Sequence, residues 1–378
     1  MTDKRFDIAI VGGGLAGLTL SIQAAKAGYQ TVLFEKEKYP FHKVCGEYIS
    51  LESWDFLLSL GLPLNEINLP IIKQLNVSSP NGKLFEHVLP LGGFGISRYK
   101  LDYELFEIAK NTGVTVLEET KVNDVAFQDN EFFIQSAIVN LKSKIVCGSF
   151  GKRSNLDVKW NRNFIQQKPN KLNNYIGVKY HIKTNYPPNL ISLHNFENGY
   201  CGISKIEDDK YCLCYLTTAE NLKKSNNNIQ QMEKEILFQN PHLKKIFSES
   251  EFLYDAPLTI SQISFNKKAQ VENHVLMLGD AAGMITPLCG NGMSMALHGS
   301  KLAFHCVDAF LQNKITRIQM EEQYQYTWNK HFAKRVKTGR MIQQFFGKSI
   351  VTNLFILLFK SFPFLAKPLI RLTHGKPF

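Results

Sequence analysis

Hydrophobic and polar positions near the start of the chain follow several patterns in turn. An unbroken apolar run from Phe6 to Val11 predicts a strand that is buried on both faces. Three glycines follow, and the segment from Leu15 to Ala27 predicts a helix. A second strand-like run, Thr31 to Phe34, ends at Glu35. Strand, tight turn, helix and strand in this order predict a β-α-β unit.

The pattern differs between residues 155 and 265. Short runs of alternating residues predict strands, which give way to a helix near Asn227 to Phe238. These strands are expected at Tyr175–His181, Leu190–Phe196, Tyr200–Ser204 and Tyr211–Leu216. Val275 to Leu278 is again an unbroken apolar run, and a long helix is predicted to begin near Asn291. The first unit is therefore interrupted by an inserted β-sheet domain.

The glycines after the first strand have the spacing of a dinucleotide-binding turn. Gly12, Gly14 and Gly17 fit the pattern G-x-G-x-x-G at the start of the helix. Glycines let the backbone approach a pyrophosphate, and the helix N-terminus offers unpaired N–H groups with a partial positive charge. Glu35 follows about 20 residues later, where an acid accepts hydrogen bonds from the ribose hydroxyls.

A second glycine-rich turn lies near the end of the chain. It reads Leu278-Gly279-Asp280-Ala281-Ala282-Gly283 and directly follows the late apolar run. The two turns together fit one large dinucleotide that is held from both ends.

We predict an α/β fold with three regions. Residues 1–154 and 266–315 form a discontinuous Rossmann-like nucleotide-binding domain, and residues 155–265 form the inserted β-sheet substrate domain. Residues 316–378 form a C-terminal helical region that is basic and apolar. The strand pieces between residues 73 and 90 fit the first domain and, as an alternative, the sheet of the second.

The net charge of +11 is unevenly distributed. Ten Lys or Arg and no Asp or Glu lie between Gln323 and Phe378, interleaved with Phe, Leu and Ile. No apolar run there approaches the roughly 20 residues that span a bilayer. Two interpretations stay open: residues 341–378 bind an anionic membrane surface, or they form a helical pair packed on the body. No nucleic-acid-binding motif accompanies the charge, so no nucleic-acid partner is expected.

Seven cysteines without a dense spacing pattern favour a reducing compartment, and we expect the protein in the cytoplasm, free or peripheral on the membrane. Neither a His-Glu-x-x-His motif nor paired Cys-x-x-Cys motifs occur, so no metal is expected. The N-terminal apolar stretch carries the glycines of the nucleotide motif and is therefore not expected to be a signal peptide.

Four stretches of the chain carry a resemblance. They are Gly12–Gly17 with Glu35; Lys43-Val44-Cys45-Gly46-Glu47; Ile96-Ser97-Arg98 with Leu101-Asp102; and Gly279-Asp280-Ala281-Ala282 with Pro287 and Gly290–Met293. Jointly they resemble the FAD-dependent oxidoreductase superfamily of the aromatic hydroxylase and geranylgeranyl reductase type, over residues 1 to about 310. The resemblance implies FAD as the cofactor.

The resemblance and the glycine turns also assign residues to that cofactor. Asp280 matches the family acid that contacts the ribityl chain, and Arg98 matches an arginine near the ribityl and phosphate region. Gly290 to Met293 would point backbone N–H groups at the flavin pyrimidine ring. The full set comprises Gly12, Gly14, Leu15, Ala16, Gly17, Glu35, Lys36, Lys43, Cys45, Gly46, Arg98, Val122, Gly279, Asp280, Pro287, Gly290, Asn291, Gly292 and Met293.

The reaction stays open between classes. We favour an FAD-dependent monooxygenase that hydroxylates a hydrophobic aromatic or polyketide-like small molecule. The alternative is a geranylgeranyl reductase-like enzyme that reduces a carbon–carbon double bond of an isoprenoid or lipid, and a second alternative is a redox-silent FAD-binding carrier. The signature Trp-x-Trp-x-Ile-Pro of the flavin halogenases is absent, so halogenation is not expected.

Four residues are candidates for catalysis. Cys45 matches a cysteine that faces the active site in the reductase branch. Glu47 and Tyr200 are further candidates, with Cys289 beside them, because an acid or a phenol in a dry pocket relays protons. Aromatic hydroxylases of this class carry an Asp-Gly element that is associated with both FAD and NAD(P)H. In this chain, Phe150 stands in the place of its acid. NAD(P)H and other reductants therefore both stay open as electron donors, as do a monomer and a homodimer.

Overall fold

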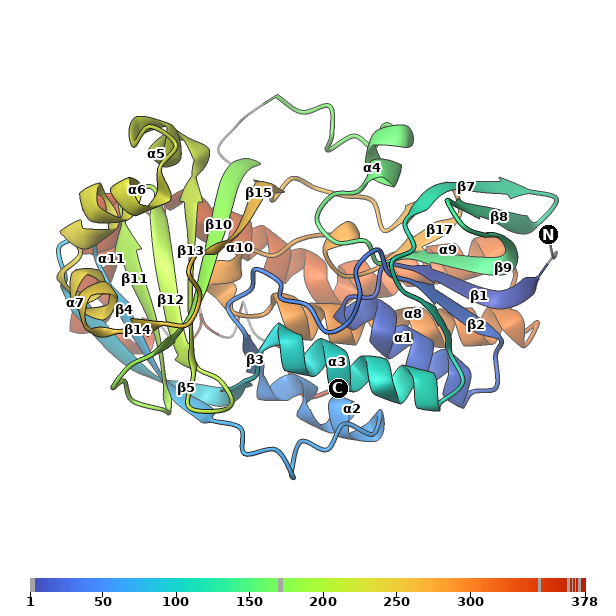
Figure 1. Cartoon of the computed structure of the whole chain (residues 1–378), viewed down its shortest axis with the longest axis horizontal. Helices are drawn as coiled ribbons and strands as arrows, with labels where there is room; N and C mark the ends of the chain where they lie inside the picture. Colours follow the sequence, from blue (N-terminus) through green and yellow to red (C-terminus); the bar gives the residue numbers. More distant parts are fainter. Residues whose placement is uncertain are drawn as a thin grey trace.

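The computed structural model describes residues 4–168, 173–345, 348–365, 368, 370, 372 and 375–378, which build two β-sheets lying side by side (Figure 1). The first sheet carries the N-terminal strands, and the second carries most of the strands from the middle of the chain. Helices from the last quarter of the chain contact both: the Tyr324 hydroxyl bonds the Met277 carbonyl of the first sheet, and Ile356 packs on Phe85 of the second.

The first sheet has the strand order β16-β17-β9-β1-β2-β6, and the hairpin β7-β8 is attached beside β9. Strand β1 pairs in parallel with both β2 and β9. The strands are β1 (Arg5–Val11), β2 (Thr31–Phe34), β6 (Thr115–Leu117), β7 (Val122–Gln128), β8 (Glu131–Ser136), β9 (Asn140–Gly148), β16 (Val271–Glu272) and β17 (Val275–Met277). Parallel strands joined by helical crossovers make this a Rossmann-like unit.

Beside this sheet, helix α1 (Leu15–Lys26) packs on both α3 (Arg98–Asn111) and α8 (Gly292–Leu311) (Figure 1). Residues 15–22 of α1 are all buried, which explains why this helix is apolar around its first turns. Ser97 caps α3 by accepting a hydrogen bond from the Lys100 N–H. The cap begins the helix at Arg98.

The second sheet has the order β14-β10-β13-β12-β11-β4-β5-β3, with β15 beside β10. Its strands are β3 (Tyr48–Ser50), β4 (Ile71–Ser78), β5 (Leu84–Gly95), β10 (Asn173–Lys183), β11 (Leu190–Phe196), β12 (Gly199–Lys205), β13 (Tyr211–Thr218), β14 (Glu251–Phe252) and β15 (Leu258–Ser264). Strands β3, β4 and β5 thus come from residues 48–95, so the sheet is not confined to residues 155–265.

The outer face of the second sheet is covered by short helices. Val178, Leu213 and Tyr215 form an apolar cluster with Met232 and Leu243 from these helices. The remaining helical segments are η1 (Leu51–Ser53), α2 (Trp54–Ser59), α4 (Asn155–Lys159), α5 (Ala219–Lys224), α6 (Ile229–Glu235), η2 (Leu237–Gln239), α7 (Pro241–Glu249), η3 (Gly279–Ala281), η4 (Pro287–Cys289), α9 (Arg317–Trp328), η5 (Asn329–Ala333), α10 (Lys334–Phe345), α11 (Ser349–Ser361) and η6 (Pro363–Leu365). In the described part of the chain, each helix is too short or too polar to cross a bilayer.

Most predicted elements are confirmed, and the differences concern their lengths. Helix α8 begins at Gly292, one residue after the predicted start. The predicted helix from Asn227 to Phe238 is divided into α6 and the 3-10 turn η2. Its amphipathic pattern places Met232 and Leu237 in the core, and this buried face is retained across the break.

Candidate active site

One large cavity lies between the two sheets, with a volume of about 1480 Å³. Gly12 and Gly14 from the first glycine turn line it, and so does Asp280 from the second turn. The far wall comes from the second sheet, where Leu193 and Cys214 are examples. The cavity therefore joins both glycine turns, which the sequence predicted would hold one molecule.

Hydrogen bonds from residues that follow β2 fix the backbone of the first glycine turn. Glu35 accepts a hydrogen bond from the Gly13 N–H at 2.9 Å, and the Tyr39 hydroxyl donates to the Gly13 carbonyl. Tyr39 is buried, and its pKa is raised well above 10 by burial and by the nearby charge of Glu35. The turn is thus rigid, and the N-terminus of α1 faces the cavity.

Gly17 differs from its predicted role. It does not line the cavity; a Cβ at this position would lie 2.1 Å from the carbonyl oxygen of Gly12. A glycine is required at position 17 because helix α1 approaches the turn too closely for any side chain. Gly17 therefore positions the cradle and does not contact the cavity.

The segment after the second glycine turn brings a helix N-terminus to the cavity. Gly290 has a left-handed backbone with φ +61°, and α8 begins two residues later. Asn291, Gly292 and Met293 line the cavity at this point. Unpaired N–H groups at the start of a helix of this length suit an acceptor that carries negative charge.

Asp280, within the second glycine turn, lines the cavity near several positively charged side chains. Burial raises the pKa of the Asp280 carboxyl, while the positive charge of Lys268 works against this rise. Burial lowers the pKa of Lys268 to about 8, and it also lowers that of Lys152 to about 8. Lys152 and Arg153 line the cavity and provide positive charge at its edge.

Arg98 is held in the wall by a buried carboxylate. Asp102 accepts from Arg98 Nε and Nη2, each at 2.7 Å, and from Lys43 Nζ at 2.8 Å. Burial would raise the pKa of Asp102, but the charges of Arg98 and Lys43 outweigh it and lower that pKa. The carboxylate thereby ties the segment that carries Cys45 to the first turn of α3.

Cys45 lies in the cavity wall close to the start of α8. Its Sγ is 3.6 Å from the Sδ of Met293, and its carbonyl accepts from the thiol of Cys212 on β13. Burial raises the pKa of the Cys45 thiol. The structure therefore brings Cys45 to the predicted cofactor position as a neutral thiol.

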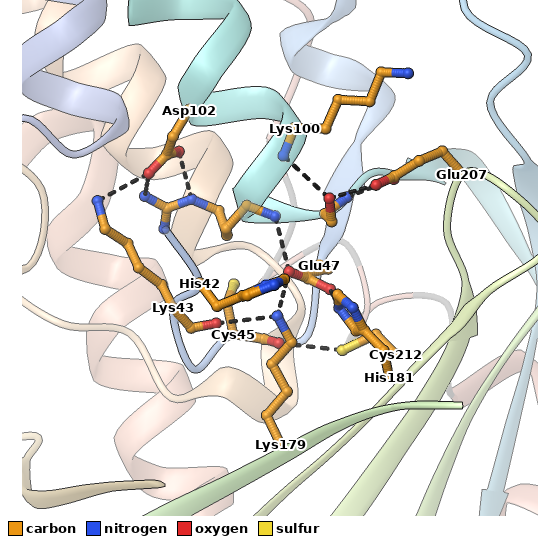
Figure 2. A network of polar contacts seen from close by, with 12 residues as sticks. His42, Lys43, Cys45, Glu47, Lys100, Asp102, Lys179, His181, Glu207 and Cys212 are labelled. Atoms are coloured by element: carbon orange, nitrogen blue, oxygen red, sulfur yellow. Dashed lines mark hydrogen bonds and ion pairs between the residues drawn. The ribbon is translucent and has the colours of Figure 1, made fainter. Parts of the chain in front are cut away.

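Glu47 follows this segment and lines the cavity, although its side chain is fully buried; Figure 2 shows its polar contacts. Its Oε1 accepts from the Arg98 N–H at 2.8 Å and from the ammonium of Lys179, and its Oε2 bonds His181 Nε2 at 2.6 Å. Glu47 has φ +53°, a left-handed conformation that costs about 1–2 kcal/mol for a residue with a side chain. These contacts hold that conformation.

Lys179, His181 and Tyr254 were missed by the sequence reasoning. Lys179 and His181 alternate on β10, which is otherwise largely apolar, and both are buried. A buried Lys and His two residues apart on a strand indicate inward-facing polar partners, and this signal was present in the sequence. Glu207 was missed as well. It accepts a hydrogen bond from the Ser97 N–H at 2.7 Å, and no pattern in the sequence indicated this contact.

The acid, histidine and thiol of this network do not fit a metal ion. Glu47, His181 and Cys212 bring one ligand atom each within 4.8 Å of one another. However, Lys179 forms an ion pair with Glu47, and a buried ammonium beside the same carboxylate opposes a cation. Burial would raise the pKa of Glu47, but the hydrogen bond from His181 and the Lys179 charge lower it. The carboxylate is therefore already neutralised.

The wall formed by the second sheet is mainly apolar. Leu75, Ile191, Leu193 and Leu216 line it from adjacent strands. Gly202 lies opposite Cys214 in the pairing of β12 with β13 and has no atoms closer than 3.6 Å to the position of a Cβ. This part of the cavity suits a hydrophobic molecule.

The remaining predicted residues also lie at this cavity. Tyr200 and Cys289 line it and are buried, and Cys289 lies 3.4 Å from the Thr286 hydroxyl. The other predicted residues in its wall are Leu15, Ala16, Lys36, Lys43, Gly46, Val122, Gly279 and Pro287. Val122 belongs to the predicted cofactor-binding set. Its carbonyl already accepts a hydrogen bond from Asn155 Nδ2 at 3.0 Å and is therefore less available to a cofactor.

Two family models match parts of this chain. The FAD binding domain model matches residues 7–42, which include the first glycine turn and Glu35. The squalene epoxidase model matches residues 202–348, which include β13, the second turn and α8. Conditioned medium factor receptor 1 of Dictyostelium discoideum is 24% identical over 94% of this chain and 72% of its own length.

Solved flavoproteins share the whole architecture. The flavin-dependent brominase Bmp2 superposes with a TM-score of 0.80 at 19% identity, covering 98% of this chain and 93% of the other. A geranylgeranyl bacteriochlorophyll reductase-like protein from Thermoplasma acidophilum gives 0.75 at 17% identity, covering 98% and 99%. At these identities the likeness concerns the fold.

The fold, with its cavity between two glycine turns, is that of the Rossmann-type flavoproteins. The chain is similar to the FAD-dependent oxidoreductases in its fold and in the FAD binding domain match over residues 7–42.

Proposed function

We propose that the protein is an FAD-dependent monooxygenase that acts on a hydrophobic small molecule, either aromatic or polyketide-like. The single observation that carries this proposal is the shared cavity, in which two nucleotide cradles continue into an apolar wall on the second sheet. FAD, when bound between the cradles, supplies the redox chemistry. The residues of this chain bind it, exclude water and orient the substrate.

The match to the squalene epoxidase model supports oxygen transfer and an apolar substrate. The matched residues include Cys214 and Leu216, which belong to the apolar wall. Gly202 also lies in this wall and adds no polar side chain to it. Both features favour a substrate without charged groups.

Reduction of a carbon–carbon double bond is the second candidate. The position of Cys45 favours it, because this thiol lies in the cavity wall against Met293 at the start of α8. A neutral thiol at that place is a proton donor for a substrate carbon. The fold similarity to the Thermoplasma reductase-like protein agrees with this alternative.

Flavin absorbance separates these functions from each other and from a redox-silent carrier. The purified protein is loaded with FAD and mixed without oxygen with NADH, NADPH or dithionite. NAD(P)H is included because Lys152 and Arg153 provide positive charge at the cavity edge. Reoxidation by air that accelerates with an apolar aromatic compound supports the monooxygenase. Reoxidation by a polyprenyl compound without oxygen supports the reductase, and a flavin that no donor reduces supports the carrier.

We further propose that the protein lies on the cytoplasmic surface of a membrane. Helix α11 packs on β5 through Ile356, whereas its outer face carries Ile350 (85% exposed) and Leu354 (65% exposed). Phe364 in η6 is also exposed. The sequence from residue 323 onward contains only basic charges, which suit anionic lipid headgroups.

Ile370, in the same C-terminal region of the chain, lies near the apolar end of the cavity. Ile370 packs against the cluster of Tyr48, Ile72 and Leu89, and Leu89 also lines the cavity. A substrate that dissolves in the bilayer would meet this end of the cavity first.

A further inference from the structure

A chain of hydrogen bonds runs from the carboxylate of Glu47, which is fully buried although this residue belongs to the cavity wall, to the exposed His42. His181 Nε2 lies 2.6 Å from Glu47 Oε2, and His181 Nδ1 lies 2.6 Å from the hydroxyl of Tyr254. This hydroxyl lies 3.3 and 3.4 Å from the two ring nitrogens of His42. His42 is exposed and lines the cavity, so the chain connects a buried acid–base pair with the contents of the site.

The geometry determines which ring nitrogen of His181 carries hydrogen. An ionised carboxylate only accepts hydrogen bonds, so the Nε2 that faces Glu47 must be the donor. In the neutral ring, Nδ1 is then the acceptor for the Tyr254 hydroxyl. A buried carboxylate that orients an imidazole in this way prepares its second nitrogen for proton transfer.

We propose that Glu47 and His181 form a buried acid–base pair that exchanges protons with the cavity through Tyr254. His42 is the last member and the group that contacts a bound molecule. The proposal rests on the proposed function in one respect only, namely that the flavin-dependent reaction consumes or releases a proton.

The transfer needs no reactant beyond the proton. When the cavity takes up a proton, the O–H bond of Tyr254 breaks as its hydrogen passes to a ring nitrogen of His42. At the same time the Nδ1–H bond of protonated His181 breaks, and that hydrogen restores the Tyr254 hydroxyl. His42 then gives the proton from its other nitrogen to the bound molecule. The reverse sequence returns a proton to His181 Nδ1, while His181 Nε2–H stays bonded to the Glu47 carboxylate.

The surroundings of His42 and Tyr254 favour the protonation states that this transfer needs. His42 is exposed on one side only; partial desolvation of its ring and the positive charge of Lys179 both lower its pKa, which favours the neutral ring. Burial raises the pKa of Tyr254 to about 12, so it keeps its hydrogen. Tyr99 stacks on the His42 ring at 4.5 Å between centroids and fixes its plane.

Charged and titratable groups face His181 from each neighbouring element. Lys179 lies on the same face of β10 and contacts Glu47, and Cys212 lies opposite His181 in the pairing with β13. The segment before β3 contributes Glu47 and His42, whose ring packs on His181 at 5.5 Å. Lys210 adds positive charge near His42. Substitutions that test the hydrogen-bond chain should therefore leave the ion pair between Glu47 and Lys179 intact.

Tyr254→Phe is the decisive variant because it removes one hydroxyl and keeps the ring. The FAD-loaded protein is reduced without oxygen and then mixed with air-saturated buffer in H₂O and in D₂O, with a pH-indicator dye to follow proton exchange. We expect proton exchange to slow by at least about tenfold and the solvent isotope effect to change. Tyr103→Phe on α3, an exposed tyrosine outside the network, should behave as the wild type.

A second measurement does not depend on FAD. ¹⁵N spectra of the histidine rings in the FAD-free protein should show His181 with hydrogen on Nε2, and Tyr254→Phe should shift its Nδ1 signal. The opposite tautomer, or unchanged exchange rates and isotope effects in Tyr254→Phe, would overturn the chain. A protein that fails to bind FAD would refute the proposed function, while the ring spectra would still decide the hydrogen-bond chain.

Discussion

The carboxylate of Glu35 accepts a hydrogen bond from the backbone N–H of Gly13 at 2.9 Å. Glu35 is the last residue of the β-α-β unit that the sequence predicts, and Gly13 lies within the glycine turn. The second carboxylate oxygen accepts from the Glu37 N–H at 3.1 Å. One side chain therefore fixes the turn and also lines the cavity where a ribose is expected.

Replacing Glu35 by Ala should weaken FAD binding by about 10- to 100-fold. The loss corresponds to a charge-assisted hydrogen bond of about 1.5–3 kcal/mol. Quenching of flavin fluorescence during titration with FAD measures the affinity. Glu131→Gln changes an acid at an exposed ion pair with Arg5 and serves as the control. Equal affinities for both variants would mean that Glu35 has no part in the site.

Replacing Gly17 by Ala should destabilise the protein by more than about 2 kcal/mol, because the new Cβ would overlap the Gly12 carbonyl. Gly28→Ala is a matched control: Gly28 has φ +86° but no atoms within 4 Å of a Cβ, so the cost should be about 1 kcal/mol. Urea unfolding of both variants measures the difference. A smaller loss for Gly17→Ala than for Gly28→Ala would contradict the packing argument.

Replacing Lys179 by Met should lower the free energy of unfolding by about 3–5 kcal/mol, because it leaves the Glu47 carboxylate buried without its cation. The double variant Glu47→Gln, Lys179→Met should recover part of this loss. Chemical denaturation of the two variants and the wild type measures both effects.

The same pair gives the stability a pH dependence. The pKa of Glu47 is lowered in the folded state, so its contribution is present above its ordinary value of 4.5 and is lost as the pH falls through the folded value. The pKa of Lys179 is raised, so its contribution is present below 10.5 and is lost at higher pH. Glu47→Gln should therefore show a shallower decline than the wild type between pH 5 and pH 3. Parallel declines would rule out this role.

Replacing Cys45 by Ala tests the reductase alternative. FAD binding should persist, because the backbone of this segment is held by Lys179 and Asp102. Loss of most turnover with a polyprenyl substrate would support a proton donor at this position, and unchanged turnover would remove Cys45 from the mechanism. Cys306→Ala, on the buried side of α8, provides a control for the loss of a thiol.

Replacing Ile350 and Leu354 by Glu should reduce binding to vesicles of anionic phospholipid by about tenfold or more. Flotation of the full-length protein measures it, and raising the salt concentration should weaken binding by the wild type. Ile318→Glu is the control, since Ile318 is 67% exposed but lies on α9. Point variants are preferable to a truncation, because Phe378 stacks on His298 at 4.2 Å. Equal flotation by all forms would refute membrane docking.

The sequence by itself determined the local features of this protein. The spacing of Gly12, Gly14 and Gly17 and the position of Glu35 specify a β-α-β unit, because each requirement lies within a short segment. The cap at Ser97 and the start of α8 near Asn291 were predictable for the same reason.

Only the tertiary structure decided which distant segments meet. Gly17 was predicted to contact FAD, yet its place against the Gly12 carbonyl depends on how closely α1 approaches the turn. Glu47, His181 and Tyr254 are far apart in the chain, and strand pairing together with burial brings them within hydrogen-bond distance. Burial then sets their charge states, because the free energy of a charge depends on partners that no local pattern reveals.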